Sequence, residues 1–188
     1  MRKDLGLDRP LLVQYWSWLS HTLQGDFGTS IQHKVPVVDY ILPAIGLSLR
    51  LAIIAFVLTV PLSIFGGITA GVMRGKPVDR VITVGGLSAA VVPEFVWAVL
   101  LILIVGVRLK WLPTSAYPGP NENLLTYAHH LILPSIALVL VLFGYISRIA
   151  RAGVIEAFDS DYVRTATLKG LSRSKVVNRH VLRNALLP

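Results

Sequence analysis

The chain has 188 residues, of which 54% are hydrophobic and only 15% are charged, and its mean hydropathy is +0.65. Because a soluble domain carries about 25% charged residues, these values exclude a disordered or conventional cytosolic protein and indicate a membrane protein. The formal charge of +8 could suggest a nucleic-acid ligand, while the absence of cysteine excludes disulfides, thiolate metal sites and cysteine nucleophiles.

The first 45 residues contain no stretch that is apolar enough to cross a membrane. They hold only polar and amphipathic runs, such as residues 11–23, and no signal peptide. We therefore predict that residues 1–45 form a segment outside the bilayer and that residues 46–188 form the membrane domain.

Three apolar stretches in the second region predict an all-α, polytopic membrane protein. The first, 51–72, has 22 uncharged residues, and a helix of that length covers roughly 33 Å, enough for a bilayer core of about 30 Å. The second, 81–107, contains one charge, Glu94, directly after Pro93. Since proline kinks a helix, we predict a break there. The third stretch has no formal charge over 123–147.

Two glycines at the end of the first span, Gly67 and Gly71, lie four residues apart. This spacing of small residues allows two membrane helices to approach each other closely. We predict that they pack against another helix, the alternative being that they face lipid.

The distribution of Lys and Arg predicts which side of the membrane each loop occupies. Arg74, Lys76 and Arg80 lie between the first two spans, and eight more basic residues follow the third, whereas the intervening loop has only Arg108 and Lys110. The positive-inside rule therefore predicts a cytoplasmic C-terminal segment and an extracytoplasmic residue range 1–45. The same distribution argues against nucleic acid as a partner, because the cations flank spans and few aromatic residues lie among them.

Features at both ends of the sequence lead us to expect that the chain is a fragment of a longer protein. An extracytoplasmic start without a signal peptide leaves the transfer of residues 1–45 unexplained, so we expect a membrane helix upstream and regard Met1 as an internal or miscalled start. The sequence stops at Pro188 in the middle of an amphipathic pattern, and we expect further chain there as well.

Residues 158–188 predict a short helix, a glycine turn and a second helix. Asp159 or Ser160 can cap a first helix of about ten residues, and Gly170 is suited to its C-terminal cap. The second helix can start at Ser172, and its apolar positions recur at helical spacing: Val177, Val181 and Ala185. From these residues alone, the segment could bind another protein close to Ala166 and Gly170, or it could lie on anionic lipid.

Several runs then identify a family resemblance that extends over essentially the whole chain. In the C-terminal segment they are Asp161-Tyr162-Val163-Arg164-Thr165-Ala166, Lys169-Gly170-Leu171 and residues 179–188; in the first segment they are residues 5–10, Gln14-Tyr15, Trp18-Leu19 and residues 25–30. The former resemble the cytoplasmic coupling loop, or EAA loop, of ABC importer permeases. Together the runs are similar to the first, B-type, permease subunit of dipeptide and oligopeptide importers, which has the type I ABC importer permease fold.

The resemblance implies a subunit that forms the translocation pathway for peptides in a bacterial or archaeal plasma membrane. It also implies partners: a second permease subunit, two cytoplasmic ATP-binding subunits that hold ATP and Mg, an external peptide-binding protein, and membrane lipid. No cofactor and no ATPase site is expected in this chain. In agreement, Gly75-Lys76 is followed by Pro77, and Ala70 stands where a phosphate loop requires glycine.

The resemblance also implies which residues contact the ATPase subunits, within a coupling loop at residues 151–188: Tyr162, Arg164, Ala166, Gly170 and Leu171. This sequence departs from the general Glu-Ala-Ala pattern, since Arg164, Thr165 and Ala166 stand in those positions. A role that needs a carboxylate at the first of them is therefore in doubt.

Glu94 leaves two hypotheses open. A carboxylate at mid-bilayer costs about 2.5 to 3.5 kcal/mol, so such residues usually have a function, and Glu94 would then face the pathway. If Pro93 marks the start of the span, Glu94 lies near the interface and most of that cost disappears. Two alternative functions also remain: a membrane-embedded enzyme that uses Glu94 and a histidine, and a non-catalytic membrane assembly subunit.

Overall fold

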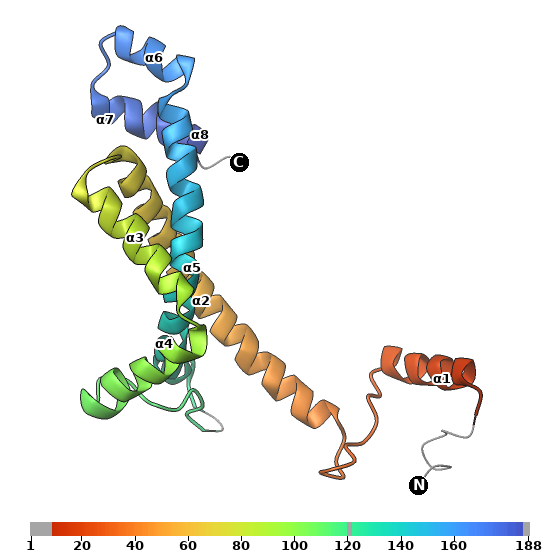
Figure 1. The fold of residues 1–188 in the computed structure, drawn as a ribbon. Helices are drawn as coiled ribbons and strands as arrows, with labels where there is room; N and C mark the ends of the chain where they lie inside the picture. Colours follow the sequence, from red (N-terminus) through yellow and green to blue (C-terminus); the bar gives the residue numbers. More distant parts are fainter. Residues whose placement is uncertain (1–8, 120–121, 186–188) are drawn as a thin grey trace. The chain divides into compact units, whose positions relative to one another are not determined.

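The computed structural model describes residues 9–119 and 122–185, and all regular elements in these ranges are helices (Figure 1). The family-like residues 5–8 and 186–188 lie outside the described ranges. Contacts divide the chain into two compact units, Met1–Leu49 and Arg50–Pro188. The predicted boundary at residue 45 falls close to this division, inside a helix that runs through both units.

The first unit contains helix α1 (Leu11–Leu23) and the start of helix α2 (Val38–Val72). The amphipathic run predicted at 11–23 coincides with α1. Between the two helices the chain folds back on itself, because the Val37 N–H donates to the Gly28 carbonyl at 2.9 Å and an isolated bridge pairs Thr29 with Pro36.

The second unit holds the rest of α2 and four further membrane-domain elements: α3 (Pro77–Val91), α4 (Glu94–Leu101), the π-helix η1 (Ile102–Arg108) and α5 (Leu124–Phe158). Helices α3 and α4 both pack against α5 (Figure 1). The helices α2 and α5, each of 35 residues, are long and apolar enough to cross a membrane. The range from Pro77 to Arg108 also passes that test, but it is bent by 98°.

The bend confirms the predicted break near Pro93. Helix α3 ends at Val91, and α4 begins at Glu94 with Pro93 as its N-cap. The two long helices differ from prediction because each continues beyond its uncharged stretch. Helix α2, for example, continues through Arg50, which precedes its uncharged stretch. The Arg50 guanidinium lies 4.3 Å from the centre of the Tyr127 ring, within reach of a cation–π contact, so this charge has a partner inside the protein and does not end the helix.

The buried face of α2 consists of small residues: Ala55, Thr59, Ser63, Gly66, Gly67, Ala70 and Gly71. Many of its large apolar side chains are exposed, with Phe56 at 67% and Phe65 at 72%. A helix in water buries its large apolar residues. The reverse arrangement suits a helix whose small face contacts protein and whose large side chains contact lipid.

The two glycines singled out in the sequence lie against α5. A Cβ atom on Gly67 would be 2.5 Å from the Ala150 Cβ, and one on Gly71 would be 2.6 Å from the Val154 Cγ1. Elsewhere on α5, a Cβ on Gly86 of α3 would be 3.1 Å from the Gly144 Cα. Helix α5 is therefore packed against both α2 and α3 at distances that only small residues permit.

Replacing Gly71 with alanine should destabilise the protein, because the new methyl group would overlap the Val154 side chain. Overpacking of this kind costs about 1 to 3 kcal/mol. The matched control is Gly85→Ala, since a Cβ on Gly85 meets nothing within 4 Å. Unfolding midpoints in mixed micelles should fall for Gly71→Ala and stay or rise for Gly85→Ala; equal midpoints would contradict the packing described.

Candidate functional site

The C-terminal segment, defined here as residues 159–185, folds as a helix, a glycine turn and a second, composite helix. Its elements are α6 (Asp161–Leu168), α7 (Arg173–Val176), the π-helix η2 (Val177–Val181) and α8 (Leu182–Ala185). The predicted order of helix, turn and helix is confirmed, and Gly170 has the left-handed backbone, with φ of +76°, that the turn requires.

Two local details differ from the sequence prediction. Ser160 occupies the N-cap position of α6, but its hydroxyl donates to the Ala157 carbonyl at 2.5 Å instead of accepting from the helix. In the second helix the predicted inward positions Val181 and Ala185 are confirmed, since Val181 belongs to the core and Ala185 packs against it, but Val176 and not Val177 is the buried residue one turn earlier. Val176 and Val181, five residues apart, are 4% and 0% exposed, because a π-helix takes wider turns than the α-helix assumed.

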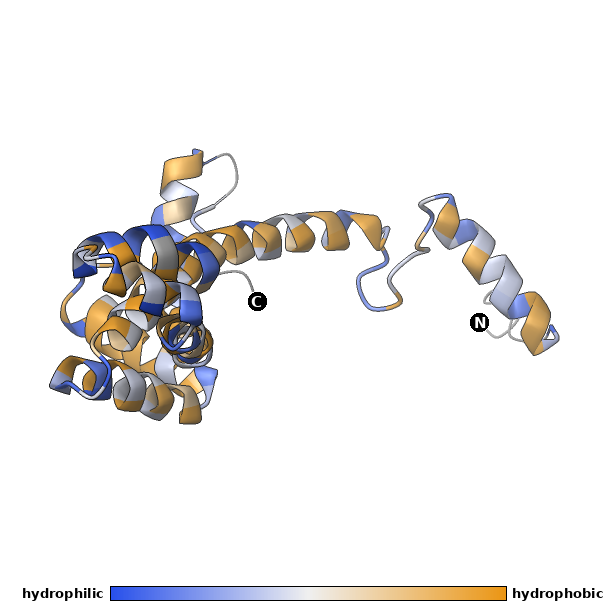
Figure 2. Ribbon diagram, turned by 90° about the horizontal axis from the view of Figure 1, so that it is seen from above, coloured by the Kyte–Doolittle hydropathy of each residue, from blue (hydrophilic) through white to orange (hydrophobic). Residues whose placement is uncertain are grey.

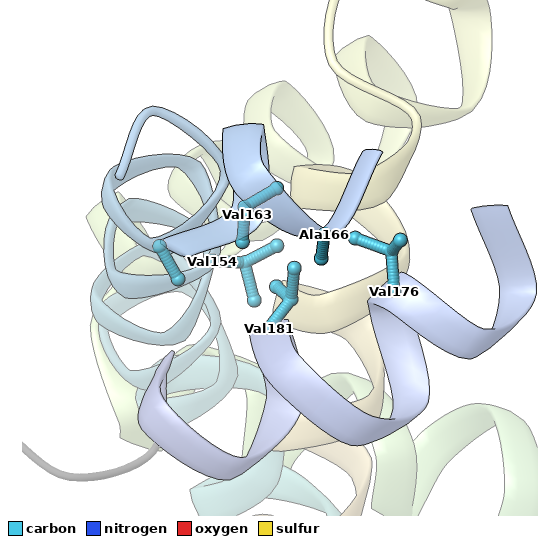
Figure 3. Close-up of a cluster of buried hydrophobic side chains, with 6 residues drawn as sticks. Val154, Val163, Ala166, Val176 and Val181 are labelled. Atoms are coloured by element: carbon cyan, nitrogen blue, oxygen red, sulfur yellow. The ribbon is translucent and has the colours of Figure 1, made fainter. Parts of the chain in front are cut away.

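A core of six buried side chains joins this segment to the end of α5 (Figure 3). It gathers residues from α5, α6, α7 and η2: Val154, Ala157, Val163, Ala166, Val176 and Val181. Val154 and Val181 are completely buried. Beside this core, a Cβ atom on Gly153 would lie 2.5 Å from the Ala185 carbonyl oxygen. The segment is therefore packed directly on the last turns of α5.

The outer face of α6 exposes most of the residues that the resemblance assigned to a protein contact. Tyr162 is 40% exposed, and Arg164 and Gly170 are exposed. Ala166 differs: it is 5% exposed and its side chain belongs to the core, so it does not share the exposure of Gly170, and its expected contact with an ATPase subunit stays a prediction. Ala166 is three residues from Val163, on the inward face of the helix. Leu171 is partly buried and packs against the same core.

Leu168 is an outer residue that the sequence analysis missed. Its side chain is 83% exposed at the end of α6, although leucine is usually buried. The signal was present in the sequence: Val163 and Ala166 share one face at a spacing of three, and Leu168 is out of phase with them. The outward face thus offers the aliphatic side chain of Leu168 and the cation of Arg164, which lie four residues apart on one short helix.

An ion pair between a buried carboxylate and a partly exposed guanidinium connects α5 to α3, and neither partner was singled out in the sequence. The Arg151 guanidinium donates to both oxygens of the Asp79 carboxylate, from Nε at 2.6 Å and from NH2 at 2.8 Å. The Gly75 N–H and the Thr83 hydroxyl also donate to this carboxylate, at 2.8 and 3.1 Å. The Asp79 side chain is only 6% exposed. With four donors, the carboxylate fixes the turn after α2, the first turn of α3 and α5 to one another.

Two weaker contacts connect the C-terminal region to the end of α2. The Arg173 NH2 group donates to the Val72 carbonyl at 3.1 Å. Such a donor satisfies one of the carbonyl groups that a helix leaves unpaired at its C-terminus. Arg74 and Asp159 form a salt bridge at 3.7 Å, but both side chains are more than half exposed, so this pair contributes little.

Beside α5, a cavity of about 680 Å³ opens between the first part of α6 and α8. Most of its lining is apolar, with Glu156, Ser160, Tyr162 and Asn184 as the polar members. A second, shallower hollow of about 370 Å³ lies near Trp111 and His129. Within the described residues, no three histidine, aspartate or glutamate side chains are arranged to hold a metal ion.

Glu94 is the first residue of α4 and is exposed, and no salt bridge joins it to another described residue. His130, which lies within the third predicted stretch, has its Nδ1 2.7 Å from the Ser115 carbonyl oxygen. The described residues therefore do not bring Glu94 into a constellation that would favour the enzyme alternative. Its place in a pathway stays a prediction.

The sequence is similar to known transport proteins over the region just described. The family described as "Binding-protein-dependent transport system inner membrane component" matches residues 63–188. This range includes Asp79, Arg151 and the whole C-terminal segment.

Individual relatives match nearly the entire chain. A putative peptide transport system permease protein of Brucella abortus is 35% identical over 187 residues, which are 100% of this chain and 60% of the relative. The oligopeptide transport system permease protein AppB of Bacillus subtilis is 35% identical over 97% of this chain and 59% of its own length. The glutathione transport system permease protein GsiC of Escherichia coli K12 is 37% identical over 188 residues, which are 100% of this chain and 59% of the relative. The chain thus spans about 60% of the length of these relatives.

Replacing Asp79 with asparagine should destabilise the protein. The amide keeps the shape of the carboxylate, but it leaves the Arg151 charge without a counter-ion. Because the Arg151 side chain is 26% exposed, the cost should lie between those of exposed and fully buried pairs, at about 1 to 3 kcal/mol. Asp159→Asn removes a carboxylate from the exposed pair with Arg74, and this should cost about 0.5 kcal/mol or less. Denaturant titrations of the two variants in mixed micelles compare these costs, and similar losses would contradict a structural role for the Asp79–Arg151 pair.

Proposed function

Because the chain belongs to the family of binding-protein-dependent transport system inner membrane components, we propose that it forms part of the membrane pathway of an ABC importer. Its cargo class is peptides. This proposal is supported by relatives named for peptide, oligopeptide and glutathione transport. The helices α2 and α5, which are long and apolar enough to span a bilayer, suit a multi-pass membrane protein.

The observation that carries the proposal is the attachment of the C-terminal segment to α5. The helix α6 is only eight residues long and would not be stable alone in water. It is held in place by Val163 and Ala166 in the shared core, while Arg164 and Leu168 are exposed on the opposite side and Tyr162 lies at the cavity beside α5. A short helix that is fixed on its inner face and apolar on part of its outer face is suited to binding a second protein.

We assign that second protein as an ATP-binding subunit in the cytoplasm. The transporter would contain two such subunits, which hold ATP and Mg, together with a second permease subunit and an extracytoplasmic peptide-binding protein. The C-terminal segment would then be cytoplasmic, as the excess of basic residues around it favours. This chain needs no nucleotide site of its own, because the chemistry of ATP hydrolysis takes place in the partners.

The packing provides a direct route for force. When ATP brings the two partner subunits together, α6 moves with them, and the shared core requires the end of α5 to follow. The Asp79–Arg151 pair then carries the displacement to α3, and the contact of Arg173 with Val72 carries it to α2. The membrane helices thereby shift between inward-facing and outward-facing states, a two-state change driven by binding energy.

Reconstitution tests the proposed transport. The complete protein, placed in liposomes with its second permease and ATP-binding partners, should import peptide only when ATP and the external binding protein are present. A non-catalytic assembly subunit would give no ATP-dependent flux. A membrane-embedded enzyme would convert a substrate without these partners.

Replacing Leu168 with serine should weaken binding of the ATP-binding subunits without destabilising the permease. An exposed leucine contributes nothing to the core of the isolated chain, but it would be buried at the contact, where its apolar area is worth about 1 to 2 kcal/mol. That corresponds to a roughly 5- to 30-fold weaker association, because each 1.4 kcal/mol is a factor of ten. Co-purification and peptide uptake measure the effect.

Leu171→Ser is the matched control, since Leu171 packs against the core and not on the outer face. It should lower the unfolding midpoint of the permease itself. The proposed contact would be refuted if Leu168→Ser left both co-purification and uptake unchanged, or if it acted only by lowering stability as Leu171→Ser does.

A further inference from the structure

Helix α1 has an apolar surface that the first unit leaves uncovered. None of its thirteen residues is buried, and Leu12, Trp16 and Leu23 are 74%, 64% and 79% exposed. Figure 2 shows the mixture of hydrophobic and hydrophilic residues along the chain. An aromatic cluster is part of this surface: the Tyr15 and Trp16 ring centroids lie 5.7 Å apart. A cluster of large apolar side chains in water is unfavourable, so this surface needs an occupant.

Most of the apolar residues of α1 share one face. At 100° per residue, four exposed residues and the partly exposed Leu19 fall within an arc of about 100°: Leu12, Tyr15, Trp16, Leu19 and Leu23. The exposed Leu11, Val13 and Trp18 lie outside this arc. The opposite side carries Gln14, Ser17 and His21. An amphipathic helix of this kind fits a boundary between an apolar and an aqueous phase.

The polar side of α1 is uncharged and hydrogen-bonded within its own segment. The Gln14 side-chain amide donates to the Arg9 carbonyl at 2.6 Å, and the His21 Nδ1 lies 2.6 Å from the Ser17 carbonyl oxygen. No aspartate, glutamate, lysine or arginine occurs between residues 10 and 25. The helix therefore offers no charge pattern that would select a charged protein surface or an anionic lipid.

A short connection keeps α1 close to the start of α2. Because the Val37 N–H donates to the Gly28 carbonyl, residues 28–37 form a closed turn, and the effective link from Leu23 is residues 24–28. Five residues extend at most about 18 Å. Helix α2 is itself apolar enough to cross a membrane. A bilayer surface is thus always within reach of α1.

We propose that α1 is an interfacial helix that lies on the membrane surface, with its Leu12–Leu23 face inserted among the lipids. Tyrosine and tryptophan prefer this depth, because their rings are apolar and their OH and NH groups reach the headgroup region. Interfacial helices usually carry Lys or Arg toward anionic headgroups. Since α1 has none, its insertion does not depend on anionic lipid.

Spin labels on the two faces test this placement. The chain contains no cysteine, so single cysteines at Leu12 and Leu19, and as controls at Ser17 and His21, can be labelled in the complete protein in nanodiscs of phosphatidylcholine. Labels on the apolar face should relax faster with oxygen, which concentrates in lipid, than with a water-soluble nickel complex. Labels on the control face should show the opposite preference. Adding phosphatidylglycerol should change neither.

Two results would overturn the proposal. If both faces collide freely with the nickel complex, α1 lies in water; if the apolar face is shielded from both reagents, a protein surface covers it. The labels report position and need no transport activity. Failure here would therefore leave the proposed import function untouched, and failure of import would leave the position of α1 measurable.

Discussion

Close packing of α5 is the constraint on which the rest of the membrane domain depends. Gly67 and Gly71 let α2 approach this helix closely, and Gly86 and Gly144 let α3 do the same. In lipid the hydrophobic effect does not drive helices together, so contact between small faces has to supply the attraction. The same requirement explains why the large side chains of α2, such as Phe65, are turned outward.

The cytoplasmic end of α5, as we assign it, combines two kinds of contact with different mechanical roles. The valine and alanine core around Val154 is non-directional and keeps the C-terminal segment on the helix. The bidentate pair of Arg151 with Asp79 is directional and fixes how α3 is oriented against α5. Together they make the outward face of α6 an extension of the membrane helices. A force applied to α6 is then transmitted instead of being absorbed by a flexible loop.

The two ends of the described chain present apolar surface to different surroundings. On α6, the exposed Leu168 and Arg164 lie four residues apart, a mixture of apolar and charged side chains that suits a protein contact. On α1, the exposed residues are apolar and aromatic without any charge, which suits lipid. Exposure alone would not distinguish the two surfaces, but the neighbouring charges do.

The sequence alone determined the class of the protein, its long apolar helices, the break at Pro93, and the glycine turn at Gly170. These features follow from local composition, proline chemistry and backbone conformation, which need no knowledge of neighbours. Only the tertiary structure decided that Ala166 faces inward, that Leu168 faces outward, and that a π-helix changes the register before Val181. The partnership of Asp79 with Arg151 belongs to the same group. The two residues are 72 positions apart, and nothing in either local sequence distinguishes an ion pair from two solvated charges until the packing of α3 on α5 brings them together.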